Sequence, residues 1–242
     1  MAPAAIVSPM KTLDFGRFEA LTFDCYGTLI DWEAGLSAAF RPILEAHGID
    51  ADADDVLERY ARHESAIERG PYLRYRDVLA AGLRGVADEL GFTPSSSEID
   101  AFAVSVPDWP PFPDSAAALA RLHERFRLGV ITNCDDDFFA ASSRRLDTTF
   151  DWVVTAQQAG SYKPKEANFH LAFERLGLPR DRILHVAQSL FHDHVPAKRL
   201  GLTSVWIDRR HDRPGSGATP PADATPDATY PDMASFAEAA TA

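Results

Sequence analysis

The chain has 242 residues, of which 45% are hydrophobic and 25% are charged, with a formal net charge of -12 at pH 7. These proportions are ordinary for a globular protein and exclude a disordered or fibrous chain, and the length suffices for one domain with an insertion or for two small domains. The acidic balance favours a small molecule or another protein as partner over nucleic acid or an acidic membrane surface, because both of the latter reward basic patches.

The predicted elements begin with a short apolar run at 20–24, which ends in Asp24 and leads into a glycine-centred turn. From about Glu33 to Asp108 the chain then has almost wholly helical spacing. The four helical stretches are 36–48, 54–70, 75–91 and 97–106. Four prolines within 107–114 stop this pattern and form a stiff linker. We therefore predict a helical domain at 33–108, inserted into an α/β core made of 1–32 and 109–242.

After the linker, apolar runs and helical patterns alternate along the chain. The runs lie at 128–133, 152–156, 183–187 and 204–208. Their continuous apolar character is typical of parallel strands that are covered on both faces. Two helical patterns end at Gly177 and Gly201, as C-terminal caps would. The alternation predicts an α/β fold with a doubly wound, Rossmann-like parallel sheet.

The last part of the chain has a different composition. Residues 211–232 are rich in Pro, Gly, Ala and Thr, which predicts an extended surface loop before a last short helix.

The start of the chain and its cysteines indicate a cytoplasmic protein. The opening "MAPAAIVSPMK" lacks the features of a signal peptide, and no apolar run approaches the roughly 20 residues of a membrane span. The two cysteines, Cys25 and Cys134, form neither a disulfide framework nor a zinc-ligand set, so we expect both to be small buried side chains. We expect no membrane association.

Polar side chains follow the strands at the edge where an open parallel sheet binds its ligands. They are Asp24, Tyr26 and Thr28 after the first strand, Thr132 and Asn133 at the end of the second, Lys163 after the third, and Gln188, Ser189, His192 and Asp193 after the fourth. Two carboxylates, one ammonium and several hydroxyl and amide groups are therefore expected to converge on one crevice.

Four motifs follow one another along the chain: Asp24 in "FDCYGTL", Thr132 in "VITN", Lys163 in "YKP" and the acidic motif "VAQSLFHD". In these motifs and their order, the sequence resembles the haloacid dehalogenase superfamily of hydrolases. The helical insertion matches the family's cap, which closes over the active site. The resemblance implies that Asp24 is a nucleophile.

The opening motif, D-x-Y-G-T, resembles the L-2-haloacid dehalogenase branch. Phosphatase members carry an acid two positions after the nucleophile and a magnesium-binding carboxylate in the fourth motif, where this chain has Tyr26 and Gln188. A tyrosine is a poor acid at neutral pH, and an amide is a weak ligand for a hard dication. Since halide leaves without a proton, the resemblance implies dehalogenation of short 2-haloalkanoic acids through an ester on Asp24, with neither metal nor cofactor.

Each remaining site residue has an expected role. Lys163 would offset the charge of the two carboxylates and keep Asp24 ionised. Asp193 would orient or deprotonate the hydrolytic water, or cap the following helix. The other assignments follow the family positions. Thr28 and Thr132 would donate hydrogen bonds to the nucleophile or to a substrate carboxylate, and Asn133 would help to hold halide. Tyr26 would line the halide pocket or pack under the cap, and Gln188 and Ser189 would replace the family's Ser- and Asn-rich fourth motif. Arg59 on the insertion, with Arg62 as rival, would attract the substrate carboxylate.

Departures from this branch leave alternatives open. Phe169 stands where the dehalogenases carry a tyrosine, and the fourth motif is longer by one residue. His192 and His194 flank Asp193 but are expected to be ordinary loop and helix residues, because adjacent helix positions point in different directions. A magnesium-dependent phosphatase of the same fold and an inactive small-molecule binding protein remain alternatives. Related enzymes are often homodimers, although nothing in the sequence identifies an interface.

Overall fold

The computed structural model describes residues 13–212 and 219–242. Its centre is a six-stranded sheet in the order β3-β2-β1-β4-β5-β6, in which every neighbouring pair is parallel. The strands are β1 (Ala20–Phe23), β2 (Arg127–Thr132), β3 (Trp152–Thr155), β4 (Ile183–Ala187), β5 (Thr203–Ile207) and β6 (Ala228–Tyr230). With β1 in the middle of the order, the prediction of a doubly wound α/β sheet is confirmed.

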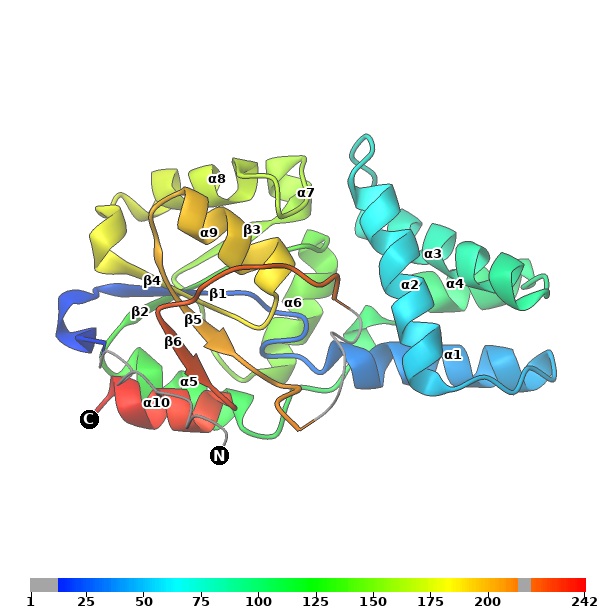
Figure 1. Ribbon diagram of the computed structural model, residues 1–242, viewed down its shortest axis with the longest axis horizontal. Helices are drawn as coiled ribbons and strands as arrows, with labels where there is room; N and C mark the ends of the chain where they lie inside the picture. Colours follow the sequence, from blue (N-terminus) through cyan, green and yellow to red (C-terminus); the bar gives the residue numbers. More distant parts are fainter. Residues whose placement is uncertain (1–12, 213–218) are drawn as a thin grey trace, which may run out of the picture.

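Helices cover both faces of this sheet (Figure 1). On one face lie α5 (Ser115–His123), α6 (Asp136–Arg145) and α10 (Met233–Ala240), and on the other lie α7 (Ala156–Ala159), α8 (Ala167–Leu176) and α9 (Val195–Arg199). Adjacent residues of β2 show why the apolar runs are continuous. Val130 packs into the apolar cluster of the first face and Ile131 into that of the second, because successive strand residues point to opposite faces.

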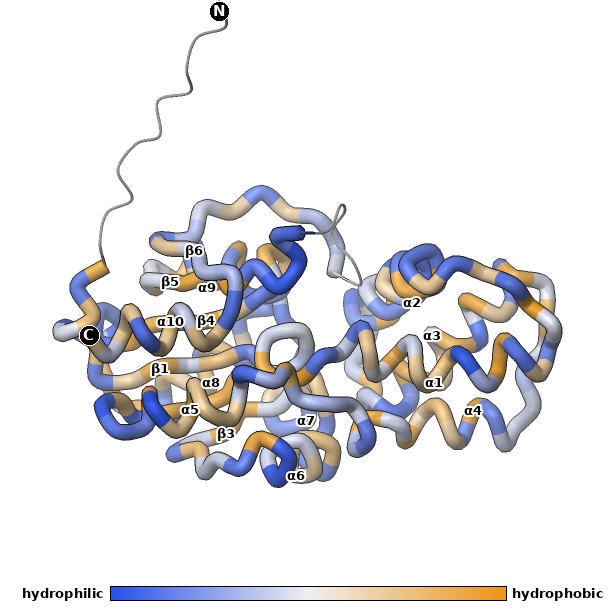
Figure 2. Tube along the Cα trace, turned by 90° about the horizontal axis from the view of Figure 1, so that it is seen from below, coloured by the Kyte–Doolittle hydropathy of each residue, from blue (hydrophilic) through white to orange (hydrophobic). Residues whose placement is uncertain are grey.

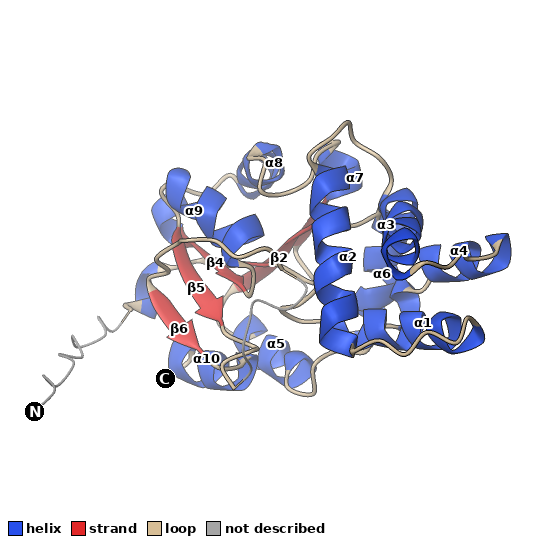
Figure 3. Ribbon diagram, turned by 45° about the vertical axis from the view of Figure 1, so that its right-hand side comes forward, coloured by secondary structure: helices blue, strands red, loops and turns tan. Residues whose placement is uncertain are grey.

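Four helices between β1 and β2 form the predicted insertion. They are α1 (Trp32–Ala46), α2 (Ala53–Glu68), α3 (Tyr75–Leu90) and α4 (Ser96–Ala103), and we call them the cap helices. They lie together beside the sheet, with α2 nearest to the strands (Figure 3). Whether 33–108 folds as a separate domain remains a prediction. No helix within the described ranges is long and apolar enough to cross a membrane.

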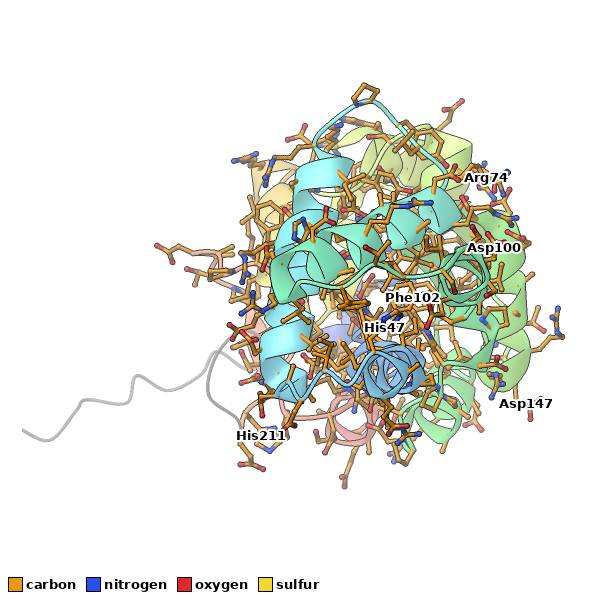
Figure 4. The ribbon with its side chains drawn as sticks, turned by 90° about the vertical axis from the view of Figure 1, so that its right-hand side faces the viewer. His47, Arg74, Asp100, Phe102, Asp147 and His211 are labelled. Atoms are coloured by element: carbon orange, nitrogen blue, oxygen red, sulfur yellow. The ribbon has the colours of Figure 1, made fainter. Side chains whose placement is uncertain are left out.

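An aromatic cluster holds the cap helices together. The ring centroids of Phe40 on α1 and Phe102 on α4 are 4.5 Å apart, and Tyr60 on α2 lies 6.0 Å from Phe40. Figure 2 shows the matching alternation of hydrophobic and hydrophilic residues along α1 and α3. Seen from outside the cap, Phe102 and His47 lie near its centre (Figure 4), and the His47 ring contacts Glu98 of α4 at 3.2 Å.

The chain passes between core and cap helices at two adjacent points. The backbone N–H of Asp31 donates to the carbonyl of Pro110 at 2.8 Å, and Ile30 forms an isolated bridge with Pro111. Gly35 lies against Trp109 so closely that an added Cβ would be 2.3 Å from the indole ring. The proline-rich segment 107–114 is therefore packed against the start of α1 as it returns to the core.

Helix ends follow local sequence signals. Asp31, at the start of α1, accepts a hydrogen bond from the N–H of Ala34, and Ser95 and Glu98 form a capping box at α4. Gly177 and Gly201 have positive φ angles of 63° and 73°, which glycine adopts without strain. These two predicted helix stops are confirmed at α8 and α9.

The edge strand β6 corrects one expectation. It lies within 211–232, which the composition predicts to be a surface loop, and Tyr230 pairs with Ile207 of β5. Residues 213–218 of that prediction lie outside the described residues. A three-residue strand with little apolar character leaves no periodic signal, and it forms here because the edge of β5 offers backbone partners.

Gly129 on β2 gives a test of the core packing. Gly129 is opposite Trp152 of β3, and an added Cβ would lie 1.9 Å from the indole. We expect Gly129→Ala to lower the free energy of unfolding by ~1–3 kcal/mol through overpacking, with an unchanged m-value in urea. The double variant with Trp152→Val should lose less than the sum of the two single losses; strict additivity would contradict the clash.

Candidate active site

A buried ammonium forms the centre of the site at the carboxyl ends of β1 and β4. Nζ of Lys163 donates to Oδ1 of Asp24 at 2.8 Å and to Oδ1 of Asp193 at 2.7 Å. It also donates to the carbonyl of Ile131 at 2.8 Å. The Lys163 side chain is 1% exposed, and these three bonds use all the donors of its ammonium. The structure thus brings together three residues that lie far apart in the sequence.

The other carboxylate oxygen of Asp24 is held by Thr28. The hydroxyl of Thr28 donates to Oδ2 of Asp24 at 2.7 Å, and accepts a hydrogen bond from the backbone N–H of Gln188 at 2.9 Å. The turn that brings Thr28 back toward Asp24 passes through Gly27 at a φ of 92°, a conformation that favours glycine. Asp24 therefore has a fixed orientation at the end of β1.

The carboxylate of Asp193 contacts a histidine that the sequence analysis missed. Nε2 of His185 on β4 lies 3.0 Å from Oδ1 of Asp193, and Nδ1 of His185 lies 2.9 Å from the hydroxyl of Thr22. A polar residue inside the apolar run 183–187 was the available signal. Oδ2 of Asp193 is buried and has no hydrogen-bond partner among the described residues. Such an atom is a natural place for a water or a polar ligand group to bind.

Burial and charge act differently on the three central groups. Burial raises the pKa of Asp24, and the charge of Lys163 only partly offsets this effect. Burial would also raise the pKa of Asp193, but the charge of Lys163 and the contact with His185 outweigh it, so that the pKa is lowered. Burial would lower the pKa of Lys163, yet the charges of Asp193 and Asp24 raise it overall. Lys163 is therefore a cation and Asp193 an anion at neutral pH.

A small cavity opens above this centre, between core and cap. Its volume is about 40 Å³, enough for a ligand of only a few heavy atoms. It is lined by Asp24, Tyr26, Trp32, Glu64, Glu68, Tyr75, Asn133, Lys163, Ser189, His192 and Asp193. The core therefore supplies the charged centre, and the cap helices supply the opposite wall.

Two cap glutamates in this wall were not anticipated. Glu64 accepts hydrogen bonds at Oε1 from the hydroxyls of Tyr60 at 3.1 Å and Tyr75 at 2.9 Å. Oε2 of Glu68 is 3.4 Å from the amide nitrogen of Asn133 and 3.8 Å from Nε2 of His192. Both glutamates lie on the buried face of α2, one turn apart. That spacing, on a face otherwise rich in apolar residues, was the signal that could have identified them.

Burial makes both cap glutamates weaker acids. It raises the pKa of Glu64 to about 7, although hydrogen bonds from Tyr75 and Tyr60 favour the charged form. It raises the pKa of Glu68 well above its ordinary value, and the nearby charge of Glu64 adds to the effect, while Lys163 and Lys165 oppose it. His192 is also affected, since burial lowers its pKa to about 4 and leaves its ring neutral at pH 7.

The expected cap arginine lies away from the cavity. Arg59 pairs with Asp55 at 2.8 Å and with Glu89 of α3 at 2.7 Å, and its rival Arg62 contacts the same Glu89. Around a helix of 3.6 residues per turn, position 59 lies about 140° from 64 and about 180° from 68. Because Glu64 and Glu68 face the cavity, Arg59 faces away from it.

The other predicted residues divide between two groups. Tyr26, Asn133 and Ser189 line the cavity. The hydroxyl of Tyr26 contacts that of Ser142 at 3.0 Å, and the side-chain carbonyl of Asn133 accepts from the N–H of Lys163 at 2.8 Å. Thr132 and Gln188 are not among the described residues that line the cavity.

Thr132 and Gln188 have structural contacts instead. The hydroxyl of Thr132 contacts Sγ of Cys134 at 3.7 Å. The side-chain carbonyl of Gln188 accepts a hydrogen bond from Thr219 at 3.3 Å, outside the cavity. Gln188 touches the site only through its backbone N–H, which supports Thr28. His194 is buried against Ser204, as an ordinary structural residue would be.

Ion pairs join the cap to the core beside the cavity. Nε of Arg74, at the edge of the cap in Figure 4, is 3.1 Å from Oδ1 of the buried Asp135. Arg76 contacts Asp137 at 2.6 Å, and the hydroxyl of Tyr162 donates to the carbonyl of Leu73 at 2.9 Å. The contacts of Arg74 and Arg76 hold the start of α3 against the start of α6, and the Tyr162 contact holds the segment before α3.

Comparisons with known proteins bear on the family and the fold of the chain. A family model described as haloacid dehalogenase-like hydrolase matches residues 18–191. The chain is 25% identical to an (S)-2-haloacid dehalogenase of Pseudomonas putida, over 81% of this chain and 86% of the relative. It is 26% identical to the haloacetate dehalogenase H-2 of Moraxella sp. (strain B), over 80% of this chain and 87% of the relative. The crystal structure of a defluorinating L-2-haloacid dehalogenase superposes with a TM-score of 0.77 at 22% identity, covering 93% of this chain and 96% of the other.

The titration of Glu64 is a direct test of the cavity wall. In a carboxyl-carbon NMR titration, we expect one glutamate to have a midpoint of about 7, and this signal to vanish in Glu64→Gln. Tyr75→Phe removes a hydrogen bond to the charged form, so the midpoint should rise further. The exposed Glu58 on the same helix provides a control variant, Glu58→Gln, that should leave the midpoint unchanged. A Glu64 midpoint at the ordinary glutamate value would refute the described burial.

Proposed function

The chain belongs to the haloacid dehalogenase-like hydrolases, and on that premise we propose that it hydrolyses a carbon–halogen bond in a small organic molecule, with Asp24 as the nucleophile. The observation that carries the proposal is the position of Lys163, bonded to both Asp24 and Asp193 under a small cavity. The names of the two curated relatives support the choice of bond, and they make short 2-haloalkanoic acids the first substrates to test.

In the first step, a carboxylate oxygen of Asp24 attacks the carbon that bears the halogen. A carbon–oxygen bond forms, the carbon–halogen bond breaks, and halide leaves with the bonding electrons. The product of this step is an ester of Asp24. Thr28 and Lys163 orient the carboxylate through their hydrogen bonds to its two oxygens.

In the second step, water attacks the ester carbonyl of Asp24. Lys163 stabilises the negative charge that develops on the carbonyl oxygen. Oδ2 of Asp193, which has no partner among the described residues, orients the water and passes its proton to the departing alkoxide. The lowered pKa of Asp193 makes it a weak base, so orientation is its larger contribution. The alcohol leaves, the second proton of the water is released to solvent, and the Asp24 carboxylate is restored with one oxygen from water.

The environment of Tyr26 favours a leaving group that needs no proton. Burial raises the pKa of Tyr26 well above its ordinary value, and its hydroxyl contacts Ser142. Tyr26 is therefore no general acid for an alkoxide, as the leaving group of a phosphate ester would require. Halide leaves as a stable anion, so the step that Tyr26 cannot assist is not needed.

The donor set does not fit a magnesium ion. Magnesium favours an octahedron of oxygen ligands with carboxylates among them. Here the ammonium of Lys163 already binds Asp24 and Asp193, and no group of three or more His, Cys, Asp or Glu within 13–212 and 219–242 could hold a metal. We therefore derive no step through a metal, and prefer the dehalogenase to the phosphatase alternative.

The nucleophile is tested by Asp24→Asn. With the fastest substrate from a panel of short monohalogenated compounds that includes L-2-chloropropionate, we expect halide release to fall by roughly 10³-fold or more, because the amide is a poor nucleophile. Asp181→Asn, an exposed change on the far side of the fold, is the matched control. A single turnover in ¹⁸O-water should place the label in Asp24 and leave the product alcohol unlabelled. Label in the alcohol alone would instead indicate direct attack by water.

The metal requirement is a separate prediction. We expect halide release to continue at an unchanged rate in the presence of a chelator, since the proposed steps use only side chains and water. Phosphate release from an aryl phosphate with added magnesium should be slower by at least about tenfold in kcat/KM, which corresponds to ~1.4 kcal/mol. Magnesium-dependent phosphate release without any halide release would favour the phosphatase alternative.

A further inference from the structure

Acidic side chains outnumber basic side chains around the cavity. Four carboxyl groups line it, from Asp24, Asp193, Glu64 and Glu68, and Lys163 is the one Lys or Arg among the described lining residues. The three donors of Lys163 already serve Asp24, Asp193 and the carbonyl of Ile131. A substrate carboxylate would therefore meet four acidic groups and an ammonium without a spare N–H.

Within the described ranges, no cationic side chain is bound to the carboxyl groups of the two cap glutamates. Glu64 and Glu68 are 5% and 7% exposed. Among the described residues, Glu64 receives hydrogen bonds only at Oε1, and Glu68 contacts an amide at 3.4 Å and the neutral ring of His192 at 3.8 Å. A buried carboxylate without a counter-charge is costly, which is why burial raises the pKa of both groups.

Besides the carboxyl groups of Glu64 and Glu68, a third hydrogen-bond acceptor lines the same cavity. Oδ2 of Asp193 is fully buried and has no hydrogen-bond partner in the described part of the chain. Unused acceptors on both the core wall and the cap wall thus call for a ligand that donates hydrogen bonds. An ammonium offers three donors and a positive charge, whereas a carboxylate offers neither.

From this arrangement we propose that the substrate of this site carries an ammonium group, which Glu64 and Glu68 bind opposite Asp24, in place of the carboxylate of a 2-haloacid. This inference rests on the proposed function, which supplies the carbon–halogen bond that is broken. It adds the class of substrate, which is a short halogenated amine. The cap ammonium site positions the halogen-bearing carbon toward Asp24. It also disfavours small acids, since the negative charges around a small cavity repel a like charge.

Binding tests the ammonium site without turnover. Calorimetry at pH 8, above the Glu64 pKa of about 7, compares propylammonium, 1-propanol and propionate, which are similar in size and differ in charge. We expect propylammonium to bind at least about tenfold more tightly than propionate, with 1-propanol between them. Equal or tighter binding of propionate overturns the proposal.

Variants locate the effect at the cap wall. Glu68→Gln should weaken propylammonium binding by about tenfold and strengthen propionate binding, since it replaces a carboxyl group that can pair with an ammonium by a neutral amide of the same shape. Glu64→Gln provides a second variant if Glu68→Gln does not fold, and Glu58→Gln on the exposed face of α2 is the matched control. Unchanged propylammonium affinity in folded Glu64→Gln and Glu68→Gln overturns the assignment.

Turnover separates this proposal from the proposed function. We expect kcat/KM for halide release from 3-chloropropylammonium to exceed that from L-2-chloropropionate by at least about tenfold, with spontaneous release subtracted by means of Asp24→Asn. Faster release from L-2-chloropropionate would overturn the ammonium proposal and leave the proposed function standing. Absence of halide release from both compounds, together with tight propylammonium binding, would overturn the dehalogenation step and support the ammonium site.

Discussion

The site depends on one buried ion cluster, in which the ammonium of Lys163 lies between the carboxylates of Asp24 and Asp193. Removing any member would leave an uncompensated charge at a buried position, which costs several kcal/mol in typical buried pairs. The parallel order of β1 and β4 places Asp24 and Asp193 at the same edge of the sheet. The Asn133 side chain then fixes the segment that carries Lys163, with hydrogen bonds to both its N–H and its carbonyl.

The cap completes the cavity with a chemistry of its own. The core residues Asp24, Lys163 and Asp193 occur at the positions that the resemblance to dehalogenases implies. The wall that α2 contributes is acidic, with Glu64 and Glu68 where a cationic side chain would suit a haloacid. In the proposed function the core carries out bond breaking and the cap meets the rest of the substrate, so that the two can differ independently. We infer that bond chemistry is similar to that of the relatives and that substrate charge differs.

Much of the fold could be predicted from the sequence because its signals are local. Continuous apolar runs indicated the five longer strands, and glycines at 177 and 201 indicated two helix ends. β6 could not be predicted, since its three residues gain their structure from pairing with β5. His185 stood out as a polar residue in an apolar run, but only the fold shows that its ring reaches Asp193.

The sequence by itself determined the order of the elements and the identity of the residues that follow β1, β3 and β4, because motif spacing and strand ends are properties of short segments. Only the tertiary structure decided which side chains meet in the cavity. The rotation of α2 about its axis turns Glu64 and Glu68 inward and Arg59 outward, toward Asp55 and Glu89. That rotation is set by packing of its apolar face against α3 and α1, which depends on contacts between segments that the sequence order does not record.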